Sequence, residues 1–521
     1  MAKSTPLIHC ACNPSTTCIP CSEVSHLDGR IHKARIVLER LEARRKAMDS
    51  VLNRHHDPFI HRLPTEIASN IFQLCCPIGL SAMFDPNFND VQQQKTQAYR
   101  KSLINPLVLG AVCRYWRAVA FSTPNLWNTI DISSRNLLLG YYLSLAREWL
   151  DRSATLPLHI QFIVHVNSEE DFLLPKIANV IELLNGYSSR WLTLDLTLPS
   201  NLLDIFHCAK GTILDTIHIS TYPFDNTEAQ TFDLGTLTSP SVLEICYSTL
   251  GNMKLDYSKL VKFSCWDVTG KEFAQIASVA TRLEILLVLR KLIEHPQDSQ
   301  PTISSTAFLH VRKFHLPAHP PAVWKQLKMP SLQDLAINDD EQIHPNLCWP
   351  EVQEFVQRSQ CRLTTLFVGG NNDSYHGIFE LLCLLPELES LVVQHPQLPE
   401  AFFQHMYNTA RLNLSQTTGS NPFLPCLRSF TYSWIRSVTW SWVRLLIPPA
   451  TDNEGTYRPL VELIFSIAWN TTEVEMRIDD DTVKTIVDAR NRGIVVDISA
   501  IREGDVIALS MEENGGQASM N

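Results

Sequence analysis

The sequence predicts an α+α/β fold class, in which a small helical domain is followed by a long, irregular α/β solenoid. Two amphipathic helical segments, near residues 63–76 and 106–120, predict the helical domain. A short apolar pattern that returns many times between residues 131 and 502 predicts the solenoid. The length of 521 residues agrees with this division, because a chain of this size is expected to hold two or three domains.

We expect residues 1–25 to form a disordered tail that contains cysteines. Cys18 and Cys21 have the spacing of zinc ligands, but Cys10 and Cys12 do not match the usual second pair, and little around them could fold. A zinc-binding tail is the alternative. We assign no metal site and no cofactor to the chain.

Residues 26–57 predict one helix with a heptad-like, coiled-coil seam, because apolar residues recur at alternating intervals of four and three. The seam is short and Arg45 interrupts it. We therefore expect this helix to pack on its own chain, with dimerisation as the alternative. The seam residues are Leu27, Ile31, Ala34, Leu38, Leu41, Arg45, Met48 and Leu52.

Residues 58–130 predict two helices separated by an inserted polar loop near 80–105. Pro64 suits the first turn of a helix, and Ile67, Ile71 and Leu74 follow as one apolar stripe. Pro106 can open the second helix, which carries two apolar stripes and must therefore pack on two sides. One side can contact the first helix, and the other needs a downstream domain or another protein. The two stripes are Leu109, Cys113, Trp116, Ala120 and Val108, Val112, Tyr115, Val119.

Four motifs lie within about residues 60–130: Leu63-Pro64-x-Glu66-Ile67, Ile71-Phe72, Val112-Cys113-Arg114-x-Trp116 and Pro124-x-Leu126-Trp127. Together they resemble an F-box. They look most like the F-box proteins abundant in mushroom-forming fungi, in which a heptad-like helix precedes the F-box and a leucine-rich-repeat-like region follows it. The inserted loop of roughly two dozen residues departs from the family pattern.

The resemblance implies a subunit that is not itself an enzyme. Such a subunit binds a Skp-type adaptor, which links it to a cullin scaffold and a RING ubiquitin ligase, while its repeats bind an unknown target protein. Trp127 would seal the junction with the repeats. By analogy, the residues in or under the adaptor-binding surface would be Leu63, Pro64, Ile67, Ile71, Leu109, Val112, Cys113 and Trp116.

Residues 131–502 repeat an apolar-x-x-apolar-x-apolar pattern whose alternating half suits a short strand. Eleven copies run from Trp191/Leu194/Leu196 to Leu460/Leu463/Phe465 and include Val242/Ile245/Tyr247. We interpret them as a degenerate leucine-rich-repeat-like solenoid, with strands on one face and irregular helices, such as one at 378–385, on the other. Most of these apolar residues are expected in the core.

Three surface features between the copies could bind a partner. They are the acidic runs 338–341 and 479–481 and the aromatic group Trp434, Trp440 and Trp442. Acidic runs are usually solvated, and tryptophans this dense could equally be core, so we assign no target site. Residues 503–521 predict a loose C-terminal tail.

Composition and absent motifs exclude several classes of function. A net charge of −10 disfavours a general binder of nucleic acid or anionic membranes. No uninterrupted apolar run reaches the roughly 18 residues of a membrane span, and no signal-peptide core is present. The fourteen cysteines are expected to be reduced, in cytoplasm or nucleus.

The sequence also lacks a phosphate-binding loop, a His-Glu-x-x-His motif and a Gly-x-Ser-x-Gly motif. The leading hypothesis is a substrate receptor of an SCF-type ubiquitin ligase. A non-catalytic interaction scaffold that is not coupled to ubiquitination is the alternative, and a metal-linked enzyme or sensor that uses the N-terminal cysteines is the third.

Overall fold

The structure is a computed structural model, and it divides the chain into two compact units. The helical unit comprises Met1–Pro77 with Ser102–Leu126, and the sheet unit comprises Ile78–Lys101 with Trp127–Asn521. The structure describes residues 19–55, 63–76, 105–164, 172–209, 212–222, 232–235, 238–246, 253–293, 308–317, 321–338, 349–370, 375–394, 398–410, 423–434, 440–447, 457–467, 478–500 and 504–505. The predicted tail cysteines up to Cys18, the inserted loop, the acidic residues 339–341 and the end of the chain after residue 505 lie outside these residues.

The helical unit contains four α-helices and one short 3-10 helix among its described residues. They are α1 (Ile19–His55), α2 (Thr65–Cys75), α4 (Pro106–Val112), α5 (Arg114–Phe121) and η2 (Pro124–Leu126). No described helix of the chain is both long and apolar enough to cross a membrane.

The predicted second helix is two helices, and this corrects the sequence analysis. Cys113 has extended backbone (φ −156°, ψ 173°), which ends α4, and its Sγ accepts the Trp116 N–H at 3.4 Å, which caps α5. The Arg117 Nε on α5 donates a hydrogen bond to the Gly110 carbonyl on α4 at 2.8 Å. Because of the break, the two stripes predicted along a single helix are divided between α4 and α5.

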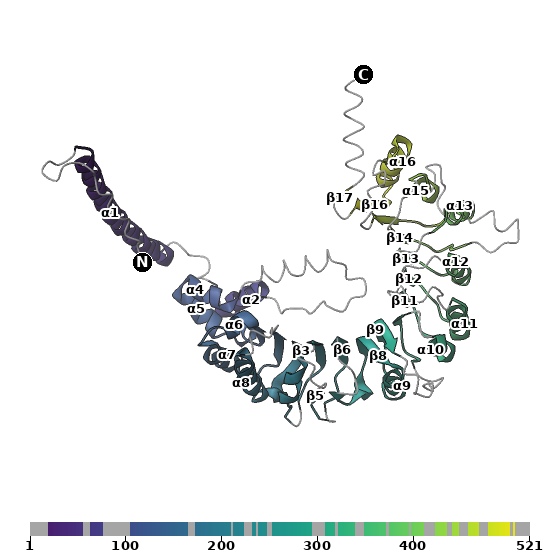
Figure 1. Ribbon diagram of the computed structural model, residues 1–521, viewed down its shortest axis with the longest axis horizontal. Coiled ribbons are helices and arrows are strands. Elements are labelled where there is room, and N and C mark those ends of the chain that lie inside the picture. The colour runs from purple at the N-terminus through teal and green to yellow at the C-terminus, as the bar shows by residue number, and fades with distance from the viewer. Residues whose placement is uncertain are drawn as a thin grey trace, which may run out of the picture. The chain divides into compact units, whose positions relative to one another are not determined.

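The sheet unit is built on one 15-stranded sheet in which every neighbouring pair is parallel except the last, β16 with β17. Figure 1 shows the strands side by side in chain order, with helices along one face. The strands are β1 (Thr129–Ser133), β2 (Leu158–Ile163), β3 (Trp191–Pro199), β4 (Thr216–Tyr222), β6 (Val242–Cys246), β8 (Lys262–Thr269), β9 (Ile285–Ile293), β10 (Lys313–Pro317), β11 (Asp334–Asn338), β12 (Thr365–Gly369), β13 (Ser390–Gln394), β14 (Ser429–Trp434), β15 (Glu462–Ile467), β16 (Val495–Ala500) and β17 (Gly504–Asp505). A separate two-stranded sheet pairs β5 (Phe232–Asp233) with β7 (Met253–Lys254).

Helices connect many of these strands and bury their apolar sides in the same core. The α-helices are α6 (Ser134–Leu137), α7 (Tyr142–Arg152), α8 (Leu174–Asn185), α9 (Gly270–Val279), α10 (Pro321–Gln326), α11 (Trp349–Ser359), α12 (Tyr375–Cys383), α13 (Glu400–Asn408), α15 (Ser441–Leu446) and α16 (Asp480–Asn491). The 3-10 helices are η4 (Ser188–Arg190), η5 (Ser200–Ile205) and η7 (Tyr257–Lys259). The predicted helix at 378–385 is present as α12, although it ends at Cys383.

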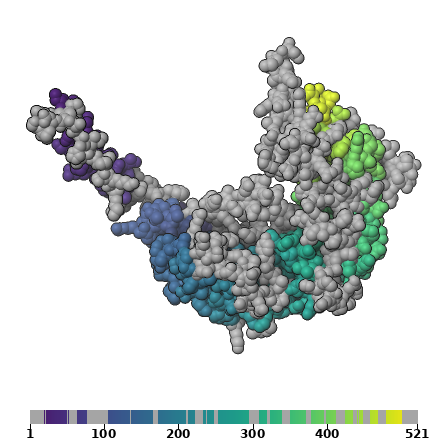
Figure 2. Space-filling model, in the orientation of Figure 1, coloured from purple at the N-terminus to yellow at the C-terminus, as the bar shows by residue number. Residues whose placement is uncertain are grey.

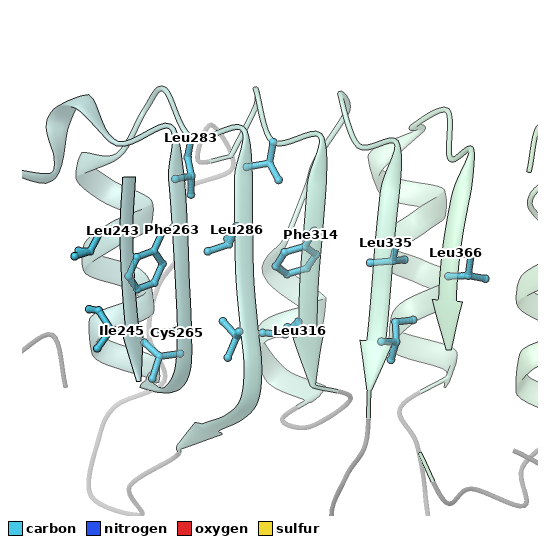
Figure 3. Close-up of a cluster of buried hydrophobic side chains, with 14 of the residues drawn as sticks. Leu243, Ile245, Phe263, Cys265, Leu283, Leu286, Phe314, Leu316, Leu335 and Leu366 are labelled. Atoms are coloured by element: carbon cyan, nitrogen blue, oxygen red, sulfur yellow. The ribbon is translucent and has the colours of Figure 1, made fainter. Parts of the chain in front are cut away.

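The core is made of side chains that stack from strand to strand in register. Leu243, Phe263, Leu286 and Phe314 occupy equivalent positions on β6, β8, β9 and β10, and all are fully buried (Figure 3). A leading apolar residue precedes many of the strands and is buried in the turn, as Leu283 is before β9. Such repetition makes each repeat depend on its neighbours for burial, as in other repeat proteins. The prediction that this region mixes α and β structure is therefore confirmed, in the form of a long parallel sheet with helices.

One predicted copy has the wrong register. In β6 the inward residues are Leu243 and Ile245, led by the buried Pro240, whereas the predicted copy began at Val242. Val242 is only half-buried, and Tyr247 lies outside the described residues. The error arose because a proline fills the leading position that the pattern required to be a larger apolar residue.

Several predicted surface and boundary features belong to the core or to helix ends. Trp440 is a buried core residue, and the half-buried Trp442 packs against the core and stacks on Phe403 with ring centroids 4.6 Å apart. Asp479 caps α16 by accepting the Thr482 N–H at 2.9 Å. Trp127, expected at the junction, is fully buried, and its ring lies 4.7 Å from that of Trp149, measured between centroids.

Candidate protein-binding surface

Helix α2 leaves its predicted apolar stripe in solvent. Ile67, Ile71 and Leu74 are 46%, 37% and 82% exposed, while Ala68 and Phe72 on the other side of the helix are buried. An amphipathic helix normally turns its apolar stripe to its own core. Because α2 has a packed side and an exposed apolar side, the exposed side is a candidate binding surface.

Helix α4 adds a second exposed apolar stripe. Asn105 caps the helix by accepting the Leu107 N–H at 2.8 Å, and Pro106 follows at the first helical position. Val108 and Val112, one turn apart, are 57% and 53% exposed, and Leu109 between them is buried. The helix therefore also has one packed side and one apolar side in solvent.

Helix α5 joins the other two helices. The rings of Phe72 on α2 and Trp116 on α5 have centroids 4.9 Å apart. The Tyr115 hydroxyl donates to the Leu63 carbonyl at 3.2 Å, next to the start of α2. On the α4 side, Arg117 Nε donates a hydrogen bond to the Gly110 carbonyl. The α2 and α4 stripes are thus positioned on one small core through α5.

The eight residues predicted to bind an adaptor fall into three groups. Four are exposed, three are half-buried and one is buried beneath the surface. The exposed residues are Pro64, Ile67, Ile71 and Val112, the half-buried ones are Leu63, Cys113 and Trp116, and the buried one is Leu109.

Two exposed residues, Leu74 and Val108, were not assigned to the site from the sequence. Both continue stripes that the sequence analysis identified, so the helical spacing already contained the signal. They were left out because the family analogy, and not the stripe itself, defined the predicted surface. Together with Ile67, Ile71 and Val112 they form what we call the apolar surface.

The apolar surface can bind a partner through apolar contacts. Burial, and then the neighbouring Cys75, raise the pKa of the Cys76 thiol at the end of α2 to about 11, so this thiol is protonated at neutral pH. Within the described ranges of the chain, no three metal-ligating side chains are grouped together.

The face of the large sheet opposite the helices is a second candidate surface. Its outward side chains form a middle row that crosses the sheet in register, polar over the first strands and mainly apolar over the later ones. From Asp195 to Ala336 the side chains of this row are buried, so its accessible part lies toward the two ends. In chain order the middle row is Asp131, Gln161, Asp195, His218, Glu244, Ser264, Leu287, His315, Ala336, Phe367, Val392, Thr431, Ile464 and Asp497.

Glu244 is the centre of the polar part of this row. Its carboxylate contacts His218 Nδ1 on one neighbouring strand and Lys262 Nζ, at 2.5 Å, on the other. Glu244 is 2% exposed, so its charge is balanced by these neighbours and not by solvent. Sequence reasoning missed this cluster because outward positions follow no apolar period.

Comparison with known proteins supplies no family for this chain. No protein-family model matches it, and no curated protein is significantly similar to it. Inference about function therefore rests on the two surfaces described above.

Proposed function

We propose that this chain is a substrate-recognition subunit of an SCF-type ubiquitin ligase. Its α2, α4 and α5 helices bind a Skp-type adaptor, and its repeat sheet binds a target protein. The exposed apolar surface of the helical unit is the observation that carries the proposal. It lies within the residues that resemble an F-box, and it leaves five aliphatic side chains between 37% and 82% exposed.

Burial of the apolar surface would favour a complex substantially. Fully burying one such side chain contributes about 1.5–3 kcal/mol, and these five residues are roughly half-exposed. Together they could therefore supply roughly 4–7 kcal/mol before the costs of association are subtracted. A partner with a matching apolar groove would gain this energy.

The repeat sheet supports the second half of the proposal. Its inward side chains build the core, while the outward side chains that remain exposed or half-buried, such as Asp131, Phe367 and Asp497, differ from strand to strand and can provide specificity. The mechanism is proximity: a target held by the repeats stays near the cullin-bound ligase, which raises the effective concentration of its lysines. This function belongs in the cytoplasm or nucleus, where the ligase would act.

The test is co-expression with a Skp-type adaptor followed by affinity capture of the chain. The disruptive variant is Ile71→Asp combined with Val112→Asp, because both side chains are exposed and neither builds the core. The matched control is Ile213→Asp, since Ile213 is 48% exposed and lies in the sheet unit. We expect the adaptor to be captured with the native chain and the control, and at least about tenfold less of it with the double variant.

Circular dichroism checks that all three proteins keep their helices. Equal capture of adaptor by folded native and double-variant chains would contradict the proposal. An adaptor complex that does not join a cullin and a RING subunit would favour the alternative, a non-catalytic scaffold that is not coupled to ubiquitination.

A further inference from the structure

Helix α1 carries an apolar seam that no described residue covers. Every side chain that the structure describes on α1 is exposed, and Figure 2 shows them in purple at the surface. The expectation that α1 packs on its own chain is therefore not met by the described residues. Val24 extends the predicted seam by one position, so the seam runs from Val24 to Leu52, about 42 Å along the helix.

The seam is long enough to form a coiled coil. It spans four heptads, and three to four are the usual requirement. The first core position of each heptad, position a, is held by Val24, Ile31, Leu38, Arg45 and Leu52. The second, position d, is held by Leu27, Ala34, Leu41 and Met48.

We infer that α1 pairs with α1 of a second copy of this chain, in antiparallel orientation. In an antiparallel pair an a residue faces a d residue of the other helix. With Leu38 facing Leu41 at the centre, Arg45 faces Ala34 of the second copy, and the reverse contact occurs at the other end. The largest and the smallest residue of the seam therefore meet, so the long arginine fills the space that alanine leaves.

Most of the remaining contacts of this register are also favourable. Ile31 faces Met48, and Leu52 faces Leu27, so these core pairs are apolar, while Val24 lies opposite the polar His55 at each end of the pair. Beside the seam, Arg35 and Glu42 of the two copies meet at e positions with opposite charge, twice in the dimer. Asp28 and Asp49 meet with like charge near the ends, where solvent screens them most.

The parallel orientation fits the same residues poorly. It would place Arg45 against Arg45 and Ala34 against Ala34, which puts two like charges and a gap inside the seam. It would also bring Arg30 next to Arg35 of the other copy. Self-association through α1 depends neither on the apolar surface of α2 and α4 nor on an adaptor, so it is independent of the proposed ubiquitin-ligase function.

Sedimentation of the full-length chain, without adaptor, over about a hundredfold range of concentration tests the inference. The native chain should form dimers, and Leu38→Asp should weaken the dimer at least about a hundredfold, because it places two carboxylates in the seam. Ile36→Asp is the matched control: Ile36 is on the same helix but outside the seam, and its replacement should leave the dimer unchanged.

Charge variants determine the orientation. Arg35→Glu should weaken an antiparallel dimer, because it faces Glu42, and adding Glu42→Arg should restore it. In a parallel dimer Arg35→Glu would instead strengthen association, because it removes the repulsion from Arg30, and this result would overturn the antiparallel inference. A native chain that sediments as a monomer throughout would overturn self-association. A monomer whose melting temperature falls with Leu38→Asp would place α1 against its own chain and would overturn it as well.

Discussion

The ring of Trp116 lies 4.9 Å from the ring of Phe72, measured between centroids, and this pair joins α5 to α2. Phe72 is 1% exposed, so Trp116 covers part of the core of the helical unit. We predict that Trp116→Ala lowers the free energy of unfolding by about 2–3 kcal/mol, somewhat less than for a fully buried tryptophan. Urea denaturation of the chain measures this change.

Ile71→Ala is the comparison for that variant, because Ile71 is exposed and should change stability by less than about 0.5 kcal/mol. Equal losses in the two variants would contradict the assignment of Trp116 to the core and Ile71 to the surface. A loss of adaptor binding in Trp116→Ala would then report on folding as much as on contact, which is why Ile71 and Val112 are the better probes of the surface.

Gly110 is predicted to resist replacement by alanine. A Cβ at this position would lie 2.8 Å from Phe121 Cε1, closer than side chains normally approach. We expect Gly110→Ala to destabilise the helical unit by about 1–3 kcal/mol through overpacking, despite the better helix propensity of alanine. Thermal unfolding followed by circular dichroism measures it.

Gly29 on α1 provides the opposite case. A Cβ there would have no neighbour within 4 Å, so Gly29→Ala should raise helix stability by up to about 1 kcal/mol. If Gly110→Ala were as stabilising as Gly29→Ala, the close contact between α4 and α5 would be wrong.

Glu244 should be required for the stability of the first half of the sheet. Glu244→Ala would leave His218 and the partly buried Lys262 without the carboxylate that they share. We expect a loss of about 2–4 kcal/mol in the free energy of unfolding, since removal of one partner from a buried ion pair is costly. The exposed Glu284 is the control, and Glu284→Ala should cost less than about 0.5 kcal/mol.

His315 should make the sheet unit less stable in acid. Burial, helped by Lys313, lowers the pKa of His315 to about 4, below the ordinary value near 6.5. The unfolded chain therefore binds the proton first, and stability contributed by neutral His315, roughly 3 kcal/mol at most, is present above about pH 6.5 and is lost between there and pH 4. His315→Leu should remove this part of the dependence.

Urea denaturation at pH 7.5 and pH 5 tests the direction of this pH dependence. The native chain should lose more free energy of unfolding between the two pH values than His315→Leu does. The leucine is suitable because the neighbours of His315 in the row, Leu287 and Ala336, are apolar, and neither ring nitrogen has a hydrogen-bond partner among the described residues. Identical pH dependence in both proteins would show that His315 is not buried in the neutral form.

The sequence predicted the inward side of the sheet well and the outward side poorly. Inward residues such as Leu286 and Leu335 recur at a fixed spacing because each must fill the same position in the stack. Outward residues such as His218 and Glu244 contact each other only across neighbouring strands that are separated in the chain. A local sequence pattern therefore does not predict their contact. The predicted copies also began at Trp191, although β1 and β2 precede it. These two copies were missed because of the residues at their leading positions. Before β1 this residue is Trp127, which was assigned to the F-box motif, and before β2 it is Pro157, which the apolar pattern does not include.

On the helical unit, the spacing found the exposed stripes but not the break between α4 and α5. A helix can continue through cysteine, and the break is shown by the extended backbone of Cys113 and by the hydrogen bond that its Sγ accepts from the Trp116 N–H. The local sequence pattern also does not identify the partner of α1, because the apolar residues of a seam have the same spacing whether the helix packs on its own chain or on another.

The short strand β17 has a consequence for solubility. A parallel sheet with a free last strand offers its unpaired backbone to any other strand, which is a route to aggregation. Gly504 and Asp505 run back against Ala500 and Ser499, so the reversed strand covers part of this edge, and the exposed Asp497 places a charge on the rest. Strand β17 thus shields part of the last edge of the sheet from pairing with a strand of another chain.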